Sequence, residues 1–397
     1  MREILELDNQ VLPYAWGSRT RIAELLGQPS PAAEPQAELW MGAHPKAPSR
    51  VRLGGEEKPL DRLIAENPAA ILGEKQLASG GPRLPFLLKV LAADRALSIQ
   101  AHPDRAQAAA GFEREERLGV PLEAEERNYR DRCHKPEVLY AVEPFSVMRG
   151  FRNQQEILEL AAPLDLEKLL PALGALRSGE EGLERFFTST LALEGEGRLR
   201  SLNRKVVARI QDRGLAGHPV YSWVLRLADQ FPDDRGVIAP LFLHVLRLEP
   251  GQAIFTGPGI LHAYLEGFGV ELMANSDNVL RGGLTTKHVD VGELKKILRF
   301  APQPPEILGP TPGPDGEKCF AAPVKDFALT LVPLEAGRPR LRKVVGVEIL
   351  LVIEGEGQIE HHDACLSFRR GSSFLVPAAA GQYTLSGEAK VFRAESA

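Results

Sequence analysis

A short polar segment provides the first side chains that can do chemistry. In Ser98-Ile99-Gln100-Ala101-His102, polar residues alternate with apolar ones. This two-residue period is typical of a β-strand, so Ser98, Gln100 and His102 are expected on one face. A strand end with Gln100 and His102 can offer an oxygen and a nitrogen to one cation. The segment therefore predicts two ligands of a metal site.

Two later segments carry further candidate ligands. The first contains His134, Lys135 and Glu137, and a carboxylate beside a lysine at a metal indicates acid–base chemistry rather than structural zinc. In the second, a Gly/Pro turn over residues 257–261 leads into a predicted strand at His262. A lone histidine is more often a hydrogen-bonded structural residue than a ligand, but three such segments in one chain favour a metal centre.

The candidate ligand set is Gln100, His102, Glu137 and His262. It supplies two nitrogens and two oxygens, which suits one zinc ion, while manganese, iron and cobalt also fit. Next to a divalent cation the pKa of Lys135 falls below its usual value of about 10.4, which makes a neutral amine available for proton transfer. The alternative interpretation of Lys135 is a surface charge.

Several blocks of the sequence agree with one known family. In chain order they are residues 14–17, 38–45, 84–91, 98–103, 134–137, 261–264 and 275–285. On these blocks the chain resembles the type I mannose-6-phosphate isomerase (phosphomannose isomerase) family, zinc enzymes of the cupin superfamily. The resemblance implies that the four candidate ligands hold one Zn²⁺ and that Lys135 lies in the active site.

The resemblance also implies roles for residues near the polar segment 275–283. It places Arg281 in the catalytic pocket, where a fixed cation can stabilise a developing enediolate or hold phosphate. Asp277, four residues earlier, is an acid that can orient this arginine. Glu271 is the main rival of Lys135 as proton acceptor. A solvated loop is the alternative interpretation of the segment.

The activity implied by the resemblance is aldose–ketose isomerisation of mannose 6-phosphate and fructose 6-phosphate through a cis-enediolate. Ser98, Lys287 and His134 are the candidate substrate-binding residues. Two other classes stay open: a non-catalytic sugar-phosphate-binding cupin and a metal-dependent cupin oxidoreductase. Four protein ligands leave fewer open positions for oxygen than redox iron enzymes use, and a pure binder has no need of a proton-transfer lysine.

Composition limits the class of protein and its partners. The net charge of the 397 residues is −5, which argues against a general nucleic-acid binder, so an anionic sugar phosphate requires a local cluster of basic side chains. Three widely spaced cysteines form neither a disulfide framework nor a zinc knuckle. No apolar run suits a signal sequence or a membrane span. We expect a cytoplasmic monomer without membrane partners.

The elements that must position these residues predict a mainly β fold with a helical insert, arranged as two jelly-roll (cupin) domains plus an all-α domain. Strand patterns over residues 1–152 and 237–300 form the two parts of the catalytic cupin domain. The helical pattern over 153–236 interrupts it. Residues 301–318 contain six prolines and are expected to be a linker. Residues 319–397 form a C-terminal metal-free cupin-like domain.

Local patterns give four narrower expectations. Asp104 caps a helix, and the charged run 113–127 is a solvated helical segment. Ser178 and Glu181 fit a capping box. The run 241–248 is a strand.

Four residues invite a different role. Cys133 and His244 stand where the resembled family usually has asparagine, which could change hydrogen bonding around the ligands or add a histidine facing the cavity. His361 and His362 are expected to be strand-end polar residues, because the distal domain offers no matching glutamate or later histidine.

Overall fold

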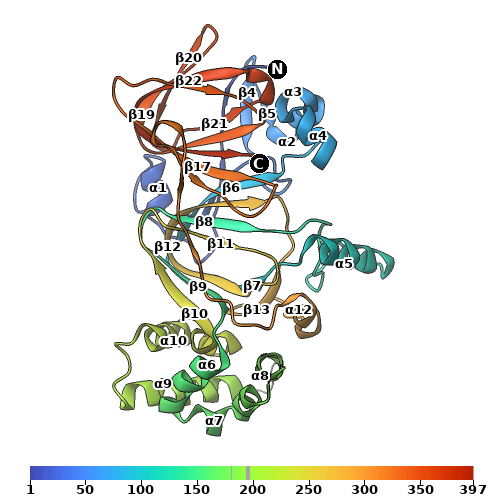
Figure 1. Cartoon of the computed structure of the whole chain (residues 1–397), viewed down its shortest axis with the longest axis vertical. Helices are drawn as coiled ribbons and strands as arrows, with labels where there is room; N and C mark the ends of the chain where they lie inside the picture. Colours follow the sequence, from blue (N-terminus) through green and yellow to red (C-terminus); the bar gives the residue numbers. More distant parts are fainter. Residues whose placement is uncertain (180, 194–196, 397) are drawn as a thin grey trace.

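Two large antiparallel β-sheets and a group of helices make up the computed structural model, which describes residues 1–179, 181–193 and 197–396. In Figure 1 the C-terminal sheet lies at the top, the other sheet in the middle and the helices of residues 154–230 at the bottom. The sequence-based prediction of a mainly β fold with an inserted helical region is therefore confirmed.

The middle sheet has eleven strands and is organised around its longest one, β12. The second half of β12 pairs with β6 and β8, whereas its first half pairs with β9 and β7. One strand thus belongs to two groups, ordered β14-β11-β8-β12-β6-β3-β2 and β10-β9-β12-β7-β13. The strands are β2 (Gln10–Leu12), β3 (Glu38–Met41), β6 (Phe86–Ala93), β7 (Ile99–Ala101), β8 (Glu137–Ala141), β9 (Phe145–Phe151), β10 (Leu243–Leu248), β11 (Ala253–Thr256), β12 (His262–Ala274), β13 (Leu280–Gly283) and β14 (Ile307–Leu308).

A glycine lets β12 pass from one group to the other. The register shifts between Tyr264 and Glu266, and Gly267 follows with a φ of 153°. A Cβ at Gly267 would lie 2.5 Å from the ring of Phe145, so only glycine fits. The side chains between the two groups form a separate apolar cluster that includes Phe145 and Tyr264. The bend in β12 therefore encloses an interior between its two halves.

The upper sheet has nine strands and includes the start of the chain. β1 pairs with β21 through Leu5 and Leu375, so the N-terminal segment completes the C-terminal sheet. The two sheets pack on each other through a shared apolar core, in which the Tyr140 ring meets those of Phe320 and Phe392 edge-on. The strands are β1 (Leu5–Glu6), β15 (Thr311–Pro312), β16 (Lys318–Phe320), β17 (Ala328–Leu334), β18 (Arg340–Lys343), β19 (Glu348–His361), β20 (Ala364–Arg369), β21 (Ser373–Val376) and β22 (Gln382–Glu395).

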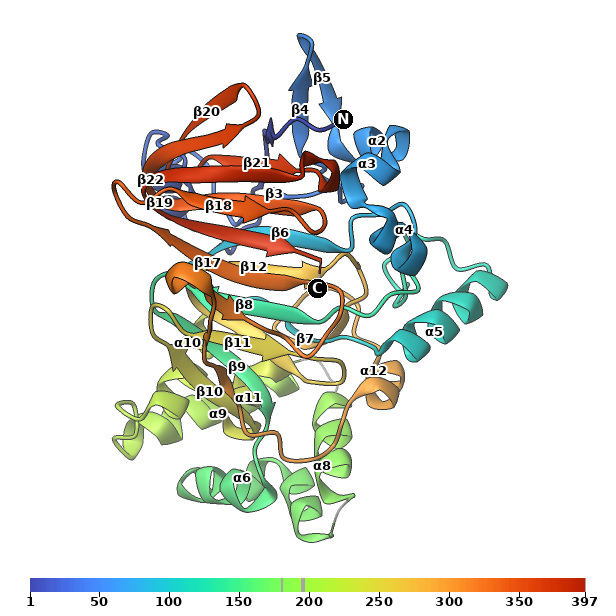
Figure 2. The same cartoon turned by 45° about the horizontal axis from the view of Figure 1, so that its top comes forward.

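Helices cover the outside of the sheets, as Figure 2 shows from a second direction. A short hairpin of β4 (Arg50–Leu53) and β5 (Glu56–Pro59) leads into the helix of residues 60–66. The α-helices are α1 (Arg21–Leu25), α2 (Leu60–Glu66), α3 (Pro68–Leu72), α4 (Glu74–Gly80), α5 (Arg105–Arg117), α6 (Gln154–Ala161), α7 (Leu166–Leu169), α8 (Gly182–Leu191), α9 (Arg198–Asp212), α10 (Pro219–Gln230), α11 (Ala239–Phe242) and α12 (Val291–Ile297). Short 3₁₀ segments join several of them, at Ala162–Leu164, Pro171–Arg177, Arg235–Ile238, Pro314–Gly316 and Ala378–Ala380.

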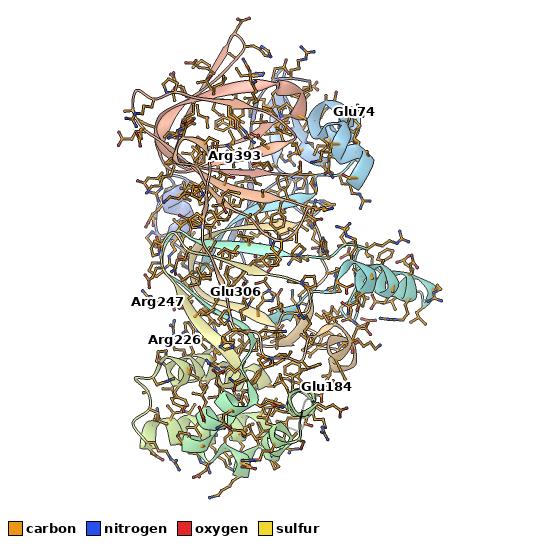
Figure 3. The ribbon with its side chains drawn as sticks, in the orientation of Figure 1. Glu74, Glu184, Arg226, Arg247, Glu306 and Arg393 are labelled. Atoms are coloured by element: carbon orange, nitrogen blue, oxygen red, sulfur yellow. The ribbon has the colours of Figure 1, made fainter. Side chains whose placement is uncertain are left out.

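The helices of residues 154–242 pack on the outer side of β9 and β10. Phe151 of β9 is fully buried, with its ring centroid 5.3 Å from that of Phe187 and 5.7 Å from that of Phe300. Glu184 of α8, labelled in Figure 3, forms an ion pair of 2.6 Å with Lys295 of α12. This helical group therefore shares one core with the lower strands of the sheet.

The local predictions were confirmed in part. Asp104 caps α5 in a capping box with Gln107. The helix ends at Arg117 and the rest of 113–127 forms turns, because Arg127 and the backbone of Asn128 donate hydrogen bonds to carboxylates of α5 instead. The capping box at Ser178 is wrong: α8 begins after Glu181 without a side-chain cap.

Two further runs differ from their expected structure. The predicted strand 241–248 begins only at Leu243, because Pro240 sits at the start of α11. The proline-rich run 301–318 contains the short strands β14 and β15 and the first residue of β16. Proline is tolerated there because these are edge strands.

Replacement of Phe151 by alanine tests the shared core. We expect Phe151→Ala to lower the free energy of unfolding by about 3–5 kcal/mol, since a buried aromatic ring is lost and a cavity remains. The measurement is urea denaturation followed by circular dichroism. Leu118→Ala is the control, because Leu118 is 72% exposed and its loss should cost little. Equal stability of the two variants would contradict this packing role.

Candidate active site

Three strands bring the candidate ligands together. His102 directly follows β7, Glu137 begins β8 and His262 begins β12. The ring nitrogen Nε2 of His102 lies 3.2 Å from Oε1 of Glu137, and Nε2 of His262 lies 3.2 Å from Oε2 of the same carboxylate. All three side chains are buried, and their ligand atoms lie within 4.8 Å of one another. Residues far apart in sequence therefore converge on one point.

The histidine tautomers leave a nitrogen of each ring free for a metal. Nδ1 of His102 lies 2.7 Å from the carbonyl oxygen of Asn278, and Nδ1 of His262 lies 3.0 Å from that of Ile260. Each Nδ1–H therefore donates to a carbonyl, which directs the lone pair of Nε2 toward Glu137. Burial, and next the charge of Lys135, lower the pKa of His102 to about 4, so its ring is neutral.

Nε2 of His102 is a buried polar atom without a hydrogen-bond partner among the described residues. An unpaired nitrogen in such a place is costly unless a ligand completes it. Two neutral imidazoles and a carboxylate are also the donor types that Zn²⁺ prefers. The residues present therefore fit one divalent cation.

Gln100 joins the same group through strand register. It lies directly opposite His262 in the pairing of β7 with β12, so both side chains project from one face. Its amide Nε2 donates a hydrogen bond to Oγ of Ser98 at 3.0 Å. The amide oxygen Oε1 is therefore the atom left to bind a cation. Gln100 and Ser98 line a cavity of about 50 Å³ together with Glu137 and His262.

Lys135 is buried beside the candidate ligands and is not a surface charge. Its Nζ lies 2.9 Å from Oε1 of Glu137, and it lines the same cavity. Burial raises the pKa of Glu137, but Lys135 and His102 outweigh it and hold this pKa well below its usual value. The carboxylate is therefore ionised and ready to bind a cation.

Glu271, on the second half of β12, lines the same cavity. Its carboxylate lies 3.3 Å from Nζ of Lys89, which is also 3.5 Å from Glu38. Burial raises the pKa of Glu271, with Lys89 opposing the shift. Burial alone would lower the pKa of Lys89, but Glu38 and Glu271 raise it above its usual value. Lys89 is thus a fixed cation next to a carboxyl group with a raised pKa.

Sequence reasoning missed Lys89 and Glu38 as cavity residues. Lys89 is the one charged side chain in Phe86–Ala93, a strand that is buried throughout. A lysine inside such an apolar run is rarely tolerated without a partner. This signal could have identified Lys89, because a lysine buried in the sheet requires a carboxylate nearby to compensate its charge.

Arg281 and Lys287 belong to a group of basic side chains near this cavity. Arg281 lies opposite Gln100 in the pairing of β13 with β7, so it projects from the same face. Burial, and next the charge of Arg130, lower the pKa of Arg281; burial, Arg281, Arg130 and Lys46 lower that of Lys287. Arg281 has no ion pair with any described residue. Such a group of mutually repelling cations is suited to an anionic ligand.

Asp277 contacts other residues than the expected arginine. Its carboxylate lies 2.9 Å from Nζ of Lys46 and 3.4 Å from Nε2 of His44. Burial raises the pKa of Asp277, but hydrogen bonds and charges from His44 and Lys46 lower it well below its usual value. Asp277 is therefore anionic and fixes Lys46 at the site.

A buried network supports His102 from behind. Oδ1 and Oδ2 of Asp131 accept hydrogen bonds from Oγ of Ser276 at 2.9 and 3.0 Å, and Oδ2 accepts one from the backbone of Asp277 at 2.8 Å. The Asn278 amide donates to the Asp131 carbonyl oxygen at 2.8 Å. Asn278 is fully buried. This network fixes the carbonyl oxygen that accepts the proton of His102.

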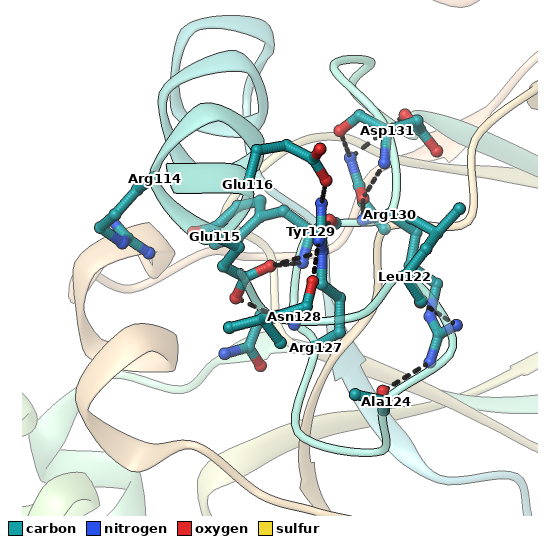
Figure 4. Close-up of polar contacts among 12 residues, drawn as sticks. Arg114, Glu115, Glu116, Leu122, Ala124, Arg127, Asn128, Tyr129, Arg130 and Asp131 are labelled. Atoms are coloured by element: carbon teal, nitrogen blue, oxygen red, sulfur yellow. Dashed lines mark hydrogen bonds and ion pairs between the residues drawn. The ribbon is translucent and has the colours of Figure 1, made fainter. Parts of the chain in front are cut away.

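The segment that carries Asp131 is itself anchored to α5. Figure 4 shows Glu115 accepting hydrogen bonds from the backbone of Asn128 and Tyr129, at 3.1 and 2.9 Å. Arg127 bonds Glu116 at 2.6 Å beside them. The charged run after Arg117 therefore positions residues 128–131 instead of extending the helix.

His134 faces away from the metal cavity. Its Nε2 lies 2.9 Å from the carboxylate of Asp326, which also pairs with Arg105 at 2.9 Å. His134 lines a second, separate cavity.

The residues that differ from the resembled family, and the histidines of the C-terminal sheet, lie outside the ligand cluster. His244 pairs with Arg149 in the ladder of β10 and β9 and does not line the metal cavity. Burial raises the pKa of the Cys133 thiol, while the Cys133 carbonyl accepts from Asn278 at 2.8 Å. The Nε2–H of His361 donates to the carbonyl oxygen of Ala380 at 3.0 Å.

The chemical capacity of the site follows from these contacts. A neutral-histidine and carboxylate cluster can hold a divalent cation, which would supply Lewis-acid chemistry to the oxygens of a bound ligand. Lys135 and Glu271 face the cavity as groups able to exchange protons. No helix in the described residues is long and apolar enough to cross a membrane.

Comparisons with known proteins agree with this geometry. Residues 4–154 match the family Phosphomannose isomerase type I, catalytic domain, and residues 316–396 match Mannose-6-phosphate isomerase, cupin domain. The chain is 38% identical to mannose-6-phosphate isomerase of Salmonella typhimurium and 37% identical to that of Escherichia coli, over 98% of each chain. It is 32% identical to the Bos taurus enzyme over 95% of this chain and 94% of that one.

Solved structures give the same result. A zinc-bound mannose 6-phosphate isomerase superposes with a TM-score of 0.90 at 36% identity, covering 99% of both chains. A variant of phosphomannose isomerase from Salmonella typhimurium superposes with a TM-score of 0.91 at the same identity and coverage. The fold and the donor set therefore point to zinc in the cluster of His102, Glu137 and His262.

Replacement of Asp131 tests whether its hydrogen bonds position the segment that orients His102. We expect Asp131→Ala to weaken zinc binding about 10–100-fold, since the segment that orients the ligand loses the hydrogen bonds of four donors to this carboxylate. Competition with a coloured chelator measures the dissociation constant directly. Asp229→Ala on α10 is the control, because Asp229 is exposed. An unchanged zinc affinity in a folded Asp131→Ala protein would refute the positioning role.

Proposed function

The chain belongs to the type I phosphomannose isomerase family, and from this premise we propose that it interconverts mannose 6-phosphate and fructose 6-phosphate at the zinc site. The observation that carries the proposal is the cluster of His102, Glu137 and His262 beside two buried groups that can carry a proton. Zinc and the isomerase family are also what the relatives' names state.

We propose that the reaction proceeds through a cis-enediolate, with a proton moved between C2 and C1 of the open-chain sugar. Lys135 and Glu271 are the two candidates for this transfer. Glu271 is supported by its raised pKa, which suits a group that accepts and returns a proton. Lys135 is supported by its contact with Glu137, since a dication bound at this carboxylate would favour the neutral amine.

Charge stabilisation falls to the basic residues. We assign Arg281 to the developing negative charge on the sugar oxygens or to the phosphate, because its guanidinium lacks an ion-pair partner among the described residues. Lys287 and Ser98 are proposed as substrate contacts, and Asp277 as the acid that holds Lys46 in place. A substrate-binding role for His134 requires its ring to exchange Asp326 for the sugar phosphate.

The finer description of the fold is part of the same proposal. We assign residues 1–152 and 237–300 to a catalytic jelly roll, 153–236 to an all-α domain, 301–318 to a linker and 319–397 to a metal-free jelly roll. The separate pairing of the two large sheets and the helices between β9 and β10 support it. We also propose a cytoplasmic monomer.

Metal removal is the direct test of the proposed activity. We expect chelated protein to lose turnover of mannose 6-phosphate in a coupled assay and to regain it with Zn²⁺. Glu137→Ala and His262→Ala should bind no metal and show no turnover, because each removes a ligand. His362→Ala, at an exposed turn of the C-terminal sheet, is the matched histidine control and should keep both. Full activity in metal-free Glu137→Ala would sink the proposal.

The role of Arg281 can be separated by kinetics. If its charge acts mainly in the transition state, as we expect, Arg281→Ala lowers kcat by about 10²-fold or more with zinc retained. A raised KM with an unchanged kcat would mean that Arg281 only holds phosphate. Near-normal values of both constants in folded, zinc-loaded protein would remove Arg281 from the site.

A further inference from the structure

A second cavity lies beside the metal centre and shares none of its lining residues. It has a volume of about 620 Å³ and is lined by residues of α5, β9 and β11, by His134, by the loop that precedes β12, by Arg299 and by the segment 323–326. That volume lies within the range of small-molecule sites in proteins, roughly 300–1,000 Å³. Of the residues given a role in the proposed isomerase reaction, His134 alone lines it.

The lining of this second cavity is strongly basic. Four permanent cations face it, and the lining contains one carboxylate. That carboxylate, Asp326, is already engaged by Arg105 and His134, each at 2.9 Å. The other cations, Arg149, Arg299 and Lys325, therefore have no counter-charge within the cavity. Because the whole chain is acidic, this concentration of positive charge is not a general property of its surface.

Arg149 is the most informative of the unpaired cations. It is half-buried, and its Nε donates to the carbonyl oxygen of Phe255 at 2.9 Å. No carboxylate of the described residues lies within 4.0 Å of its guanidinium nitrogens. Its terminal nitrogens therefore have donor capacity to spare at the cavity. Burial lowers the pKa of Arg149, and the charge of Glu306, which is labelled in Figure 3, opposes this shift without forming an ion pair.

The rest of the lining is apolar. Phe255, Pro258, Ile260 and Val324 supply ring and aliphatic surface between the cations. Apolar walls with a few convergent charged groups are typical of sites for small organic ligands. An inorganic ion would satisfy the cations but leave this surface uncovered, whereas an organic anion would satisfy both.

We propose that this cavity is a second ligand site, which binds a small organic phosphate through Arg149, Arg299 and Lys325 while the apolar part of the ligand packs on Phe255 and Val324. The site adjoins the metal centre through two residues of its lining. The carbonyl of Ile260 holds the ring of His262, and His134 immediately precedes Lys135. A ligand here therefore contacts segments that carry active-site groups.

The probe for the test is 4-nitrophenyl phosphate, which joins a phosphate to a flat ring. Calorimetry on the zinc-loaded chain should show binding to one site, with weaker binding of inorganic phosphate and of 4-nitrophenol, because each lacks one half of the interaction. Binding should weaken as salt is raised, since the contacts are charged and partly exposed. No detectable binding of the probe at millimolar concentration would overturn the proposal.

Two variants separate this cavity from the metal site. Arg299→Glu combined with Lys325→Glu should weaken the probe at least about tenfold, by reversing two charges at the cavity, with turnover of mannose 6-phosphate within twofold of wild type. Arg281→Ala should leave probe binding intact. The opposite pattern, loss in Arg281→Ala with binding kept in the double variant, would assign the probe to the active site and refute the second site.

The matched control reverses two charges elsewhere. Arg52 of β4 and Arg62 of α2 are exposed, and both elements lie beside the C-terminal sheet in Figure 1, away from β9 and α12. Arg52→Glu with Arg62→Glu changes the net charge by the same amount and should leave the probe affinity unchanged. An equal loss in this control would show a non-specific charge effect and would also refute the site.

Discussion

The buried carboxylate of Glu137 is the interaction on which the site depends. A charge that is 3% exposed is costly unless neighbours compensate it. Lys135 at 2.9 Å and two imidazole nitrogens at 3.2 Å surround it. The neutral His102 adds no charge of its own, so the compensating charge comes from Lys135 or from a bound cation. Burial raises the pKa of Glu271 against the opposing charge of Lys89, and the charge of Glu137 adds to this rise. The carboxylate of Glu137 thus both contributes to the metal site and influences the pKa of a neighbouring acid–base group.

This carboxylate can be buried because β12 connects two groups of strands. Its first half carries His262 and its second half carries Glu271, and both point into the space that the bend at Gly267 encloses. In a regular strand, two residues nine positions apart project from opposite faces, so the register shift between Tyr264 and Glu266 is needed to bring both to one cavity. Water is limited in this cavity, and each charge there is felt strongly. The geometry of one strand therefore sets the electrostatic strength of the whole site.

Much of the site could be predicted from the sequence, because its ligands lie in short motifs whose strand period fixes the face of each side chain. Gln100 and His102 are examples. Contacts made across the fold could not be predicted. Asp277 was expected beside Arg281, four residues away, yet it pairs with Lys46 and His44, since the segment is held by Asp131. His134 sits next to Lys135 in sequence but on the other side of the backbone, where it pairs with Asp326. The end of α5 was predicted wrongly for a related reason. The helix ends at Arg117 because the chain after it turns back and hydrogen-bonds to α5 through the backbone of Tyr129, which positions Asp131.

The pairing of β1 with β21 has a consequence for synthesis in the cell. The strand Leu5–Glu6 is synthesised long before its partner Ser373–Val376. Its hydrogen-bonding edge therefore stays without that partner until β21 has been made, and the long loop closes only once the C-terminal sheet exists. A nascent chain that stops early exposes apolar surface of the core shared by the two sheets.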